Sequence, residues 1–153
     1  MNFILRSTLV AALAALAALS LAPTLASAQN AVTAAAAKEA GAVVTATGLV
    51  YRSLKDGTGA SPKASDRVKV HYRGTFPDGK EFDSSYKRND AIEFPLNGVI
   101  SCWTEGVQRM KVGGKAKLTC PSAIAYGERG AGGVIPPNAT LLFEVELLAI
   151  NGK

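Results

Sequence analysis

Alternation of apolar and polar residues, repeated in several separate segments, most constrains the fold of this chain. Residues 67–73, 115–120 and 141–147 place an apolar side chain at every second position, with mostly charged or polar residues between. A period of two is that of a strand with one buried face and one face in water. Weaker strands are expected at 49–54 and 91–96. The pattern therefore predicts an antiparallel sheet of about five strands.

One short segment has a helical period instead. Trp103, Val107 and Met110 lie at i, i+4 and i+7, on one face of a helix, and Gly113 follows its end. Several antiparallel strands and this helix predict an α+β fold, in which a twisted antiparallel sheet wraps around one short helix. Residues 121–139 show neither period, and a loop of that length in a small domain usually carries function.

The N-terminal residues have the composition of a secretory signal. Arg6 precedes an apolar run over residues 8–22, and Ala26 and Ala28 give the small-residue pattern that signal peptidase recognises. The run has about 15 residues, fewer than the roughly 20 of a membrane-spanning helix. We therefore expect residues 1–28 to be a cleaved signal peptide, rather than an uncleaved anchor, and no membrane anchor after cleavage.

Two parts follow the expected signal peptide. Residues 29–47 are rich in Ala, Val and Thr and show no amphipathic stripe, so we expect an Ala-rich linker that is at most loosely helical. Residues 48–153 are expected to form one domain. The net charge of +5 comes from cations that are scattered along the chain. Scattered cations fit solvated strand faces and argue against a nucleic-acid partner.

The residues of most catalytic sites are missing. His71 is the only histidine and lies on the polar side of an expected strand, so a structural role is favoured over that of a general base. One His and two Cys cannot form an ordinary zinc site, and no phosphate-binding loop is present, so we expect no metal and no cofactor. Asp83 could pair with Asp90 or Glu93 as catalytic carboxylates, but their spacing does not force them together.

The two cysteines, Cys102 and Cys120, could form a disulfide in an exported protein. The strand that ends at Cys120 should run back along the helix and bring this residue toward the helix start, beside Cys102. The alternative is two buried free thiols, because Cys120 shares the inward register of Ala116 and Leu118.

Six short motifs follow one another along the chain: 70–74 (VHYRG), 78–85 (DGKEFDSS), 98–100 (GVI), 103–107 (WTEGV), 125–127 (AYG) and 135–143 (IPPNATLLF). Their order and spacing over about residues 48–150 resemble those of the tacrolimus-binding, or FKBP-type, peptidyl-prolyl cis–trans isomerases. The short loops around Asn97 and the expected signal peptide are similar to the exported bacterial branch of that family. The resemblance thus implies a periplasmic or secreted bacterial protein.

The resemblance also implies a pocket for a prolyl ring, with Trp103 as its floor, aromatic walls, and a polar rim. The implied catalytic residues are Tyr72, Phe82, Asp83, Trp103, Tyr126 and Phe143. The implied substrate-binding residues are Ile92, Val99, Ile100 and Ile135, and the Ile100 N–H would donate to a substrate carbonyl. Ile92 and Ala131 depart from the best-known eukaryotic pattern. These two differences affect the implied ligand affinity and sequence preference more than the implied activity.

Rotation about an X–Pro bond breaks no covalent bond, so it needs no nucleophile, base or metal. The resemblance implies an isomerase that acts on X–Pro bonds of exported proteins and assists their folding, by non-covalent stabilisation of a twisted amide. Its partners would be proline-containing polypeptides, its ligands tacrolimus or rapamycin, and its state a monomer. Two other interpretations stay open. One is a chaperone or protein-binding module on the same fold with weak or incidental isomerase activity; the other is a carrier of apolar ligands.

Overall fold

The computed structural model describes residues 24–153. Residues 1–23, with most of the expected signal peptide and all of its apolar run, lie outside this description. The strands are β1 (Ala42–Val44), β2 (Val50–Lys55), β3 (Arg67–Thr75), β4 (Glu81–Ser84), β5 (Ile92–Pro95), β6 (Lys115–Cys120) and β7 (Leu141–Ile150). The helices are α1 (Leu25–Ala37), α2 (Ser85–Arg88) and α3 (Ser101–Gln108), with 3-10 turns at Leu96–Gly98 and Ser122–Ile124.

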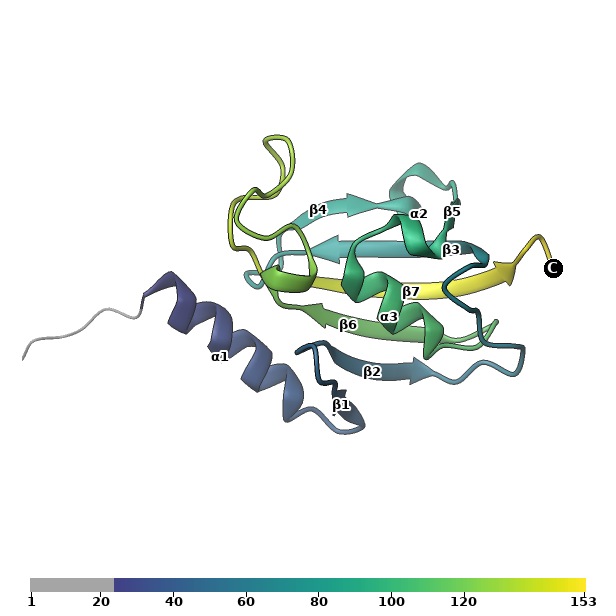
Figure 1. The fold of residues 1–153 in the computed structure, drawn as a ribbon, viewed down its shortest axis with the longest axis horizontal. Helices are drawn as coiled ribbons and strands as arrows, with labels where there is room; N and C mark the ends of the chain where they lie inside the picture. Colours follow the sequence, from purple (N-terminus) through teal and green to yellow (C-terminus); the bar gives the residue numbers. More distant parts are fainter. Residues whose placement is uncertain (1–23) are drawn as a thin grey trace, which may run out of the picture.

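The strands form one antiparallel sheet in the order β1-β2-β6-β7-β3-β4 (Figure 1). β7 pairs with β3 along most of its length, and the other edge of β3 is shared by β5 and β4. The antiparallel sheet and its short helix are confirmed, but the sheet has seven strands in the described residues rather than about five. The difference arises because two short strands divide one edge of β3, and because β1 lies in the segment expected to be a linker.

The predicted alternation is the burial pattern of the central strands. In β3 and β7 every second side chain is buried, and these side chains face α3. Trp103 and Val107 of α3 pack into the same core. Gly106 lets the helix approach the sheet, because a Cβ at this position would lie 2.7 Å from Leu118 Cδ2. α3 therefore packs closely against the sheet. This packing fixes the position of the helix relative to β6 and β7.

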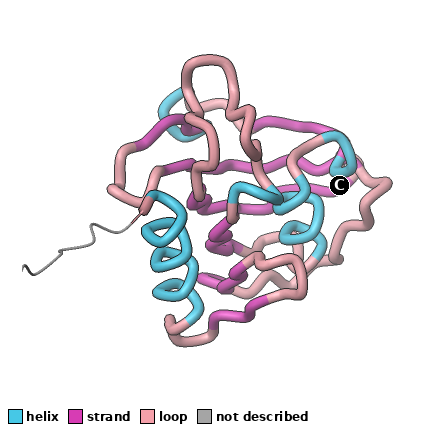
Figure 2. Tube along the Cα trace, turned by 60° about the vertical axis from the view of Figure 1, so that its left-hand side comes forward, coloured by secondary structure: helices cyan, strands magenta, loops and turns pink. Residues whose placement is uncertain are grey.

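The segment expected to be a linker differs from that expectation, since it is part of the fold. Ala36 of α1 is buried, and Glu39 forms ion pairs with Arg52 at 2.9 Å and Lys117 at 3.0 Å. The Gln29 side chain accepts a hydrogen bond from the Thr140 N–H at 2.7 Å. α1 therefore lies on the face of the sheet opposite α3, as Figure 2 shows.

The contact of α1 with the sheet could not be predicted from the sequence, and the reason is physical. The helix is attached by alanines and by polar side chains, so it carries no stripe of large apolar residues. α1 also runs through Ala28, the residue after which cleavage was expected. Within residues 24–153, no helix is long and apolar enough to cross a membrane.

Candidate functional site

An aromatic cavity of about 420 Å³ opens on the α3 side of the sheet. It is lined by Tyr72, Phe82, Asp83, Ile92, Phe94, Gly98, Val99, Ile100, Trp103, Tyr126 and Phe143. The structure thus brings together every side chain of the expected catalytic set, from β3, β4, α3, β7 and the long loop. Of the expected substrate-binding residues, only Ile135 is not in the lining.

Trp103 forms the floor of this cavity. It is 5% exposed, and its ring lies 5.2 Å from those of Tyr72 and Phe143, both in edge-to-face contact. Phe94 of β5 adds a tilted contact at 5.5 Å. The indole Nε1 of Trp103 is buried and meets no acceptor within the described residues. A buried donor without a partner is unfavourable, so Nε1 is an unsatisfied group at the cavity floor.

The aromatic walls of the cavity depend on Gly74, which has no side chain. Phe82 and Phe143 meet edge to face at 5.7 Å and flank the floor. A Cβ at Gly74 of β3 would lie 2.5 Å from Phe82 Cζ and 3.0 Å from Phe143 Cε1. Real Cβ contacts are longer than this, so the two rings occupy the space that any other residue at position 74 would take.

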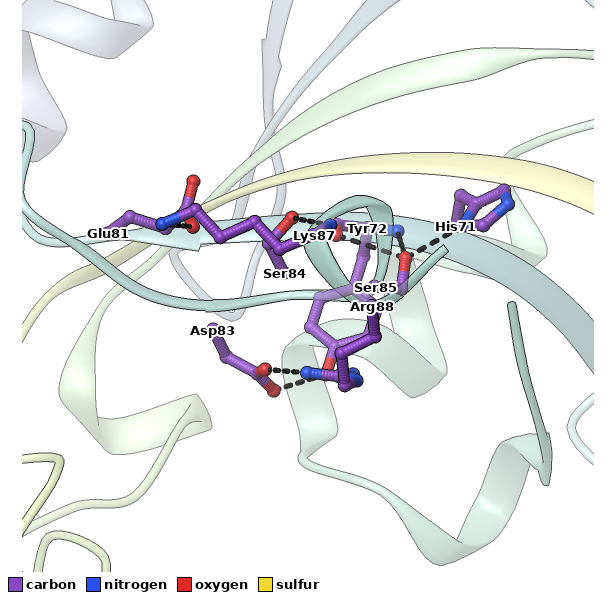
Figure 3. A network of polar contacts seen from close by, with 8 residues as sticks. All are labelled: His71, Tyr72, Glu81, Asp83, Ser84, Ser85, Lys87 and Arg88. Carbon is purple, nitrogen blue, oxygen red and sulfur yellow. Dashed lines mark hydrogen bonds and ion pairs between the residues drawn. The ribbon is translucent and has the colours of Figure 1, made fainter. Parts of the chain in front are cut away.

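Three side chains form the polar rim (Figure 3). The Tyr72 hydroxyl donates to Asp83 Oδ2, and Arg88 donates from Nη1 to Asp83 Oδ1 at 2.5 Å and from Nη2 to the Tyr72 hydroxyl at 3.2 Å. Burial alone would raise the pKa of Asp83, but these hydrogen bonds outweigh it and hold the pKa below the ordinary value of 3.8. Burial, with the hydrogen bond to Asp83, raises the pKa of Tyr72 above 10.0. At neutral pH the rim is therefore a carboxylate, a phenol and a guanidinium.

Sequence reasoning missed Arg88. It is the last residue of the one-turn helix α2, whose N-cap Ser84 accepts from the Lys87 N–H and whose C-cap Asn89 has a positive φ of 49°. A serine followed five residues later by an asparagine is the local signal for such a turn. Only the fold shows that its last residue reaches back to Asp83.

Buried hydrogen bonds hold α2 beside the cavity. The Ser85 hydroxyl accepts from the Tyr72 N–H at 2.7 Å and donates to the Tyr72 carbonyl at 3.2 Å. His71 Nδ1 lies 2.9 Å from the same hydroxyl, and the imidazole stacks on Tyr86 at 4.8 Å. His71 is not in the cavity lining, and its contacts are structural.

The carboxylate pairing that the sequence left possible does not form. Glu93 binds Arg67 at 3.1 Å, and Asp83 binds Arg88, so each carboxylate has its own cation. Neither Asp90 nor Glu93 lines the cavity. Among residues 24–153 there is also no group of three potential metal ligands. The cavity can therefore bind and orient a ligand, but its rim offers no acidic proton at neutral pH.

The long loop contributes Tyr126, which is 39% exposed at the mouth of the cavity. Ile135 has a different place from the one expected: its side chain is 7% exposed and packs in the core. Its backbone exchanges hydrogen bonds with Ala131, at 2.9 and 3.0 Å. Ile135 therefore closes the loop on itself and packs in the core instead of lining the site.

The start of α3 completes the site. Ile100 is the N-cap residue, so its N–H precedes the helix and has no acceptor within it. Cys102, one residue before the floor, is joined to Cys120 at the end of β6, with the two Cα atoms 5.9 Å apart. The disulfide thus ties the start of α3 to the strand from which the long loop departs.

The sequence of this domain matches a known family. The family model described as "FKBP-type peptidyl-prolyl cis-trans isomerase" matches residues 59–148, so the chain belongs to that family. It is 60% identical over 117 residues to the FkpA isomerase of Aeromonas hydrophila, a match that covers 76% of this chain and 43% of that protein. It is 54% identical over 114 residues to FkpA of Escherichia coli K12, covering 74% of this chain and 42% of that protein. The chain thus spans less than half the length of these two curated relatives.

Solved structures agree with the fold. The crystal structure of Escherichia coli FkpA has a TM-score of 0.78 at 49% identity, covering 80% of this chain and 57% of that one. The structure of a peptidyl-prolyl isomerase from Pseudomonas syringae has a TM-score of 0.75 at 41% identity, covering 80% of this chain and 90% of that one.

Proposed function

We propose that this chain is a peptidyl-prolyl cis–trans isomerase that acts on X–Pro bonds of other polypeptides. One observation carries the proposal: an apolar, aromatic cavity has a buried tryptophan as its floor and an ionised, fully paired carboxylate at its rim. Such a cavity has the size and lining to take a prolyl ring, while the rim can orient polar groups of the backbone.

The chemistry follows from the peptide bond. Resonance gives the planar amide a rotation barrier of about 18–20 kcal/mol, and X–Pro bonds exchange in tens to hundreds of seconds unaided. Halfway through the rotation the amide has lost conjugation and is less dipolar than either planar form. An apolar cavity penalises the planar forms more than the twisted one, and this difference lowers the barrier.

The residues have separate roles in this proposal. Trp103, Phe82 and Phe143 hold the prolyl ring and exclude water from it. The Ile100 N–H donates to a carbonyl of the substrate backbone. Asp83 stays ionised and positions the Tyr72 hydroxyl at the rim, so it orients and does not donate a proton.

Replacing the floor tests this function. Trp103→Leu keeps an apolar side chain but removes the ring, and we expect kcat/KM on a proline tetrapeptide to fall at least tenfold, or about 1.4 kcal/mol of barrier. The same variant should bind tacrolimus more weakly. Tyr51→Leu is the matched control, since it removes an aromatic ring of β2 outside the cavity and should leave both values unchanged. A folded Trp103→Leu variant that isomerises as fast as the wild type would show that the cavity is not the active site. Wild-type protein without isomerase activity would instead favour the chaperone interpretation.

We further propose that the protein is exported to the periplasm or secreted, assists the folding of exported proteins, binds tacrolimus or rapamycin, and is a monomer. The N-terminal apolar run supports export, and the cavity lining supports ligand binding. The contacts of α1 with its own sheet support a monomer. The mass of the exported protein and its light scattering test the cleavage site and the monomer, respectively.

A further inference from the structure

A second hollow adjoins the aromatic cavity. An open groove of about 710 Å³ follows the outer side of α3 and is lined by Thr47, Asn97, Val99, Ser101, Thr104, Glu105, Gln108 and Arg109. Val99 lines both hollows, so the groove lies directly beside the aromatic cavity. The aromatic cavity is suited to one prolyl ring, and a polypeptide substrate must leave it over some surface. This groove is next to the cavity and offers such a surface.

The residues of the groove are polar or charged apart from Val99, and the two charged ones, Glu105 and Arg109, do not form an ion pair with each other. Glu105 and Arg109 are four residues apart on one helix, a spacing that commonly gives an ion pair. Here the Thr47 hydroxyl donates to Glu105 Oε2 at 2.5 Å instead. Asp56 lies near Arg109 in a neighbouring hollow but accepts from the Ser53 hydroxyl at 2.6 Å. Arg109 is exposed and forms no ion pair within residues 24–153. The far end of the groove therefore presents an unpaired guanidinium.

The reaction decides which side of the substrate can lie there. Rotation about the X–Pro bond moves the part of the chain before the bond relative to the prolyl ring. Trp103 holds the ring, so the ring and the residues after it can stay in place while the preceding residues turn. A fixed groove that gripped the preceding residues would oppose the rotation. A groove beside the ring site can hold the following residues without this cost.

The spacing sets the register. Trp103 and Arg109 are six residues apart along α3 and its C-cap, which is about 9 Å along the helix axis at roughly 1.5 Å per residue, with Trp103 on the buried side and Arg109 on the exposed side. An extended chain covers that distance in about three residues. We propose that the α3 groove binds the substrate chain on the C-terminal side of the proline, and that Arg109 favours a carboxylate about three residues beyond it. This inference rests on the proposed isomerase function and names a substrate preference for it.

Matched peptides test the preference. Each contains one Ala-Pro bond and carries Asp, Asn or Lys at the third position after the proline, and kcat/KM is measured by NMR exchange between the cis and trans forms. At low ionic strength we expect the Asp peptide to exceed the Asn peptide about two- to fivefold, and the Lys peptide to be the slowest. The difference should shrink at about 1 M NaCl, because the charges are exposed.

Variants assign the effect to Arg109. Arg109→Gln should abolish the preference and Arg109→Glu should reverse it, each measured relative to the Asn peptide in the same variant. Lys69→Glu makes the same change of charge sign on the opposite face of β3 and should keep the wild-type order. Thermal melts check that each variant is folded.

The outcomes separate the two proposals. If wild-type protein isomerises none of the peptides, the isomerase proposal fails. If it isomerises all three at the same rate, or if only a charge placed before the proline matters, the groove proposal is overturned while the isomerase proposal stands.

Discussion

Reducing the bond between Cys102 and Cys120 should destabilise the protein by about 3 kcal/mol. The two cysteines are 18 residues apart, and both are fully buried. In the chain-entropy description, a link that closes a loop of this length restricts the unfolded chain by about 3 kcal/mol at 25 °C. Because the thiols stay packed in the core as small apolar groups, the native contacts change little and the loss arises mainly in the unfolded state.

Urea unfolding of oxidised and reduced protein measures this difference. We expect a lower midpoint for the reduced protein, and a melting temperature lower by about 10 °C for a domain of this size. The Cys102→Ala/Cys120→Ala double variant should behave like the reduced protein, with a further small loss from the missing sulfur atoms. Reductant should have no effect on this double variant. Thiol titration of the unreduced exported protein in denaturant gives the refuting result. Two reactive thiols there would show that no bond exists and that the midpoint shift has another cause.

Three further predictions concern the rim and α1. Arg88→Ala removes the cation that Asp83 and Tyr72 share, and we expect kcat/KM to fall about fivefold with little change in stability, because the arginine is half exposed; an unchanged kcat/KM would contradict its positioning role. Isomerase activity should be flat from about pH 5 to pH 8. The lowered pKa of Asp83 keeps it ionised there, so its contribution is lost only as the pH falls below 3.8, and a midpoint inside the flat range would argue for acid catalysis. Deleting residues 29–40 from the mature chain removes the Glu39 ion pairs and should lower the melting temperature by several degrees; an equal melting temperature would show that this part of α1 contributes nothing to the fold.

The sequence predicted the fold where burial follows a simple period. β3, β7 and α3 bury side chains at every second or every third to fourth position, so their apolar faces can be located without coordinates. The same reasoning failed for α1, whose buried side consists of alanines and polar groups. A small residue gives the same signal whether it is exposed in a linker or packed against a sheet.

Parts of the site could be predicted where one residue could be recognised from its own position in the sequence. Trp103 and Phe143 lie on predicted buried faces, and the motif resemblance placed them together. Phe94 was missed as a wall, although it lies two residues after Ile92 and therefore on the same side of β5. Arg88 depends on a contact across a turn, and Ile135 supports a loop from inside. Motif matching does not distinguish a residue that lines a cavity from one that supports the lining.

Gly74 limits which substitutions around the cavity the fold can accept. Because the rings of Phe82 and Phe143 already fill the space beside its Cα, a larger residue at position 74 is tolerable only after one of them becomes smaller. The order of substitutions is thus constrained: a ring must shrink first, widening the cavity, before the strand can accept a side chain. A substitution at position 74 alone would force the rings of Phe82 and Phe143 to move, whereas the same substitution combined with a smaller residue at position 82 or 143 would not.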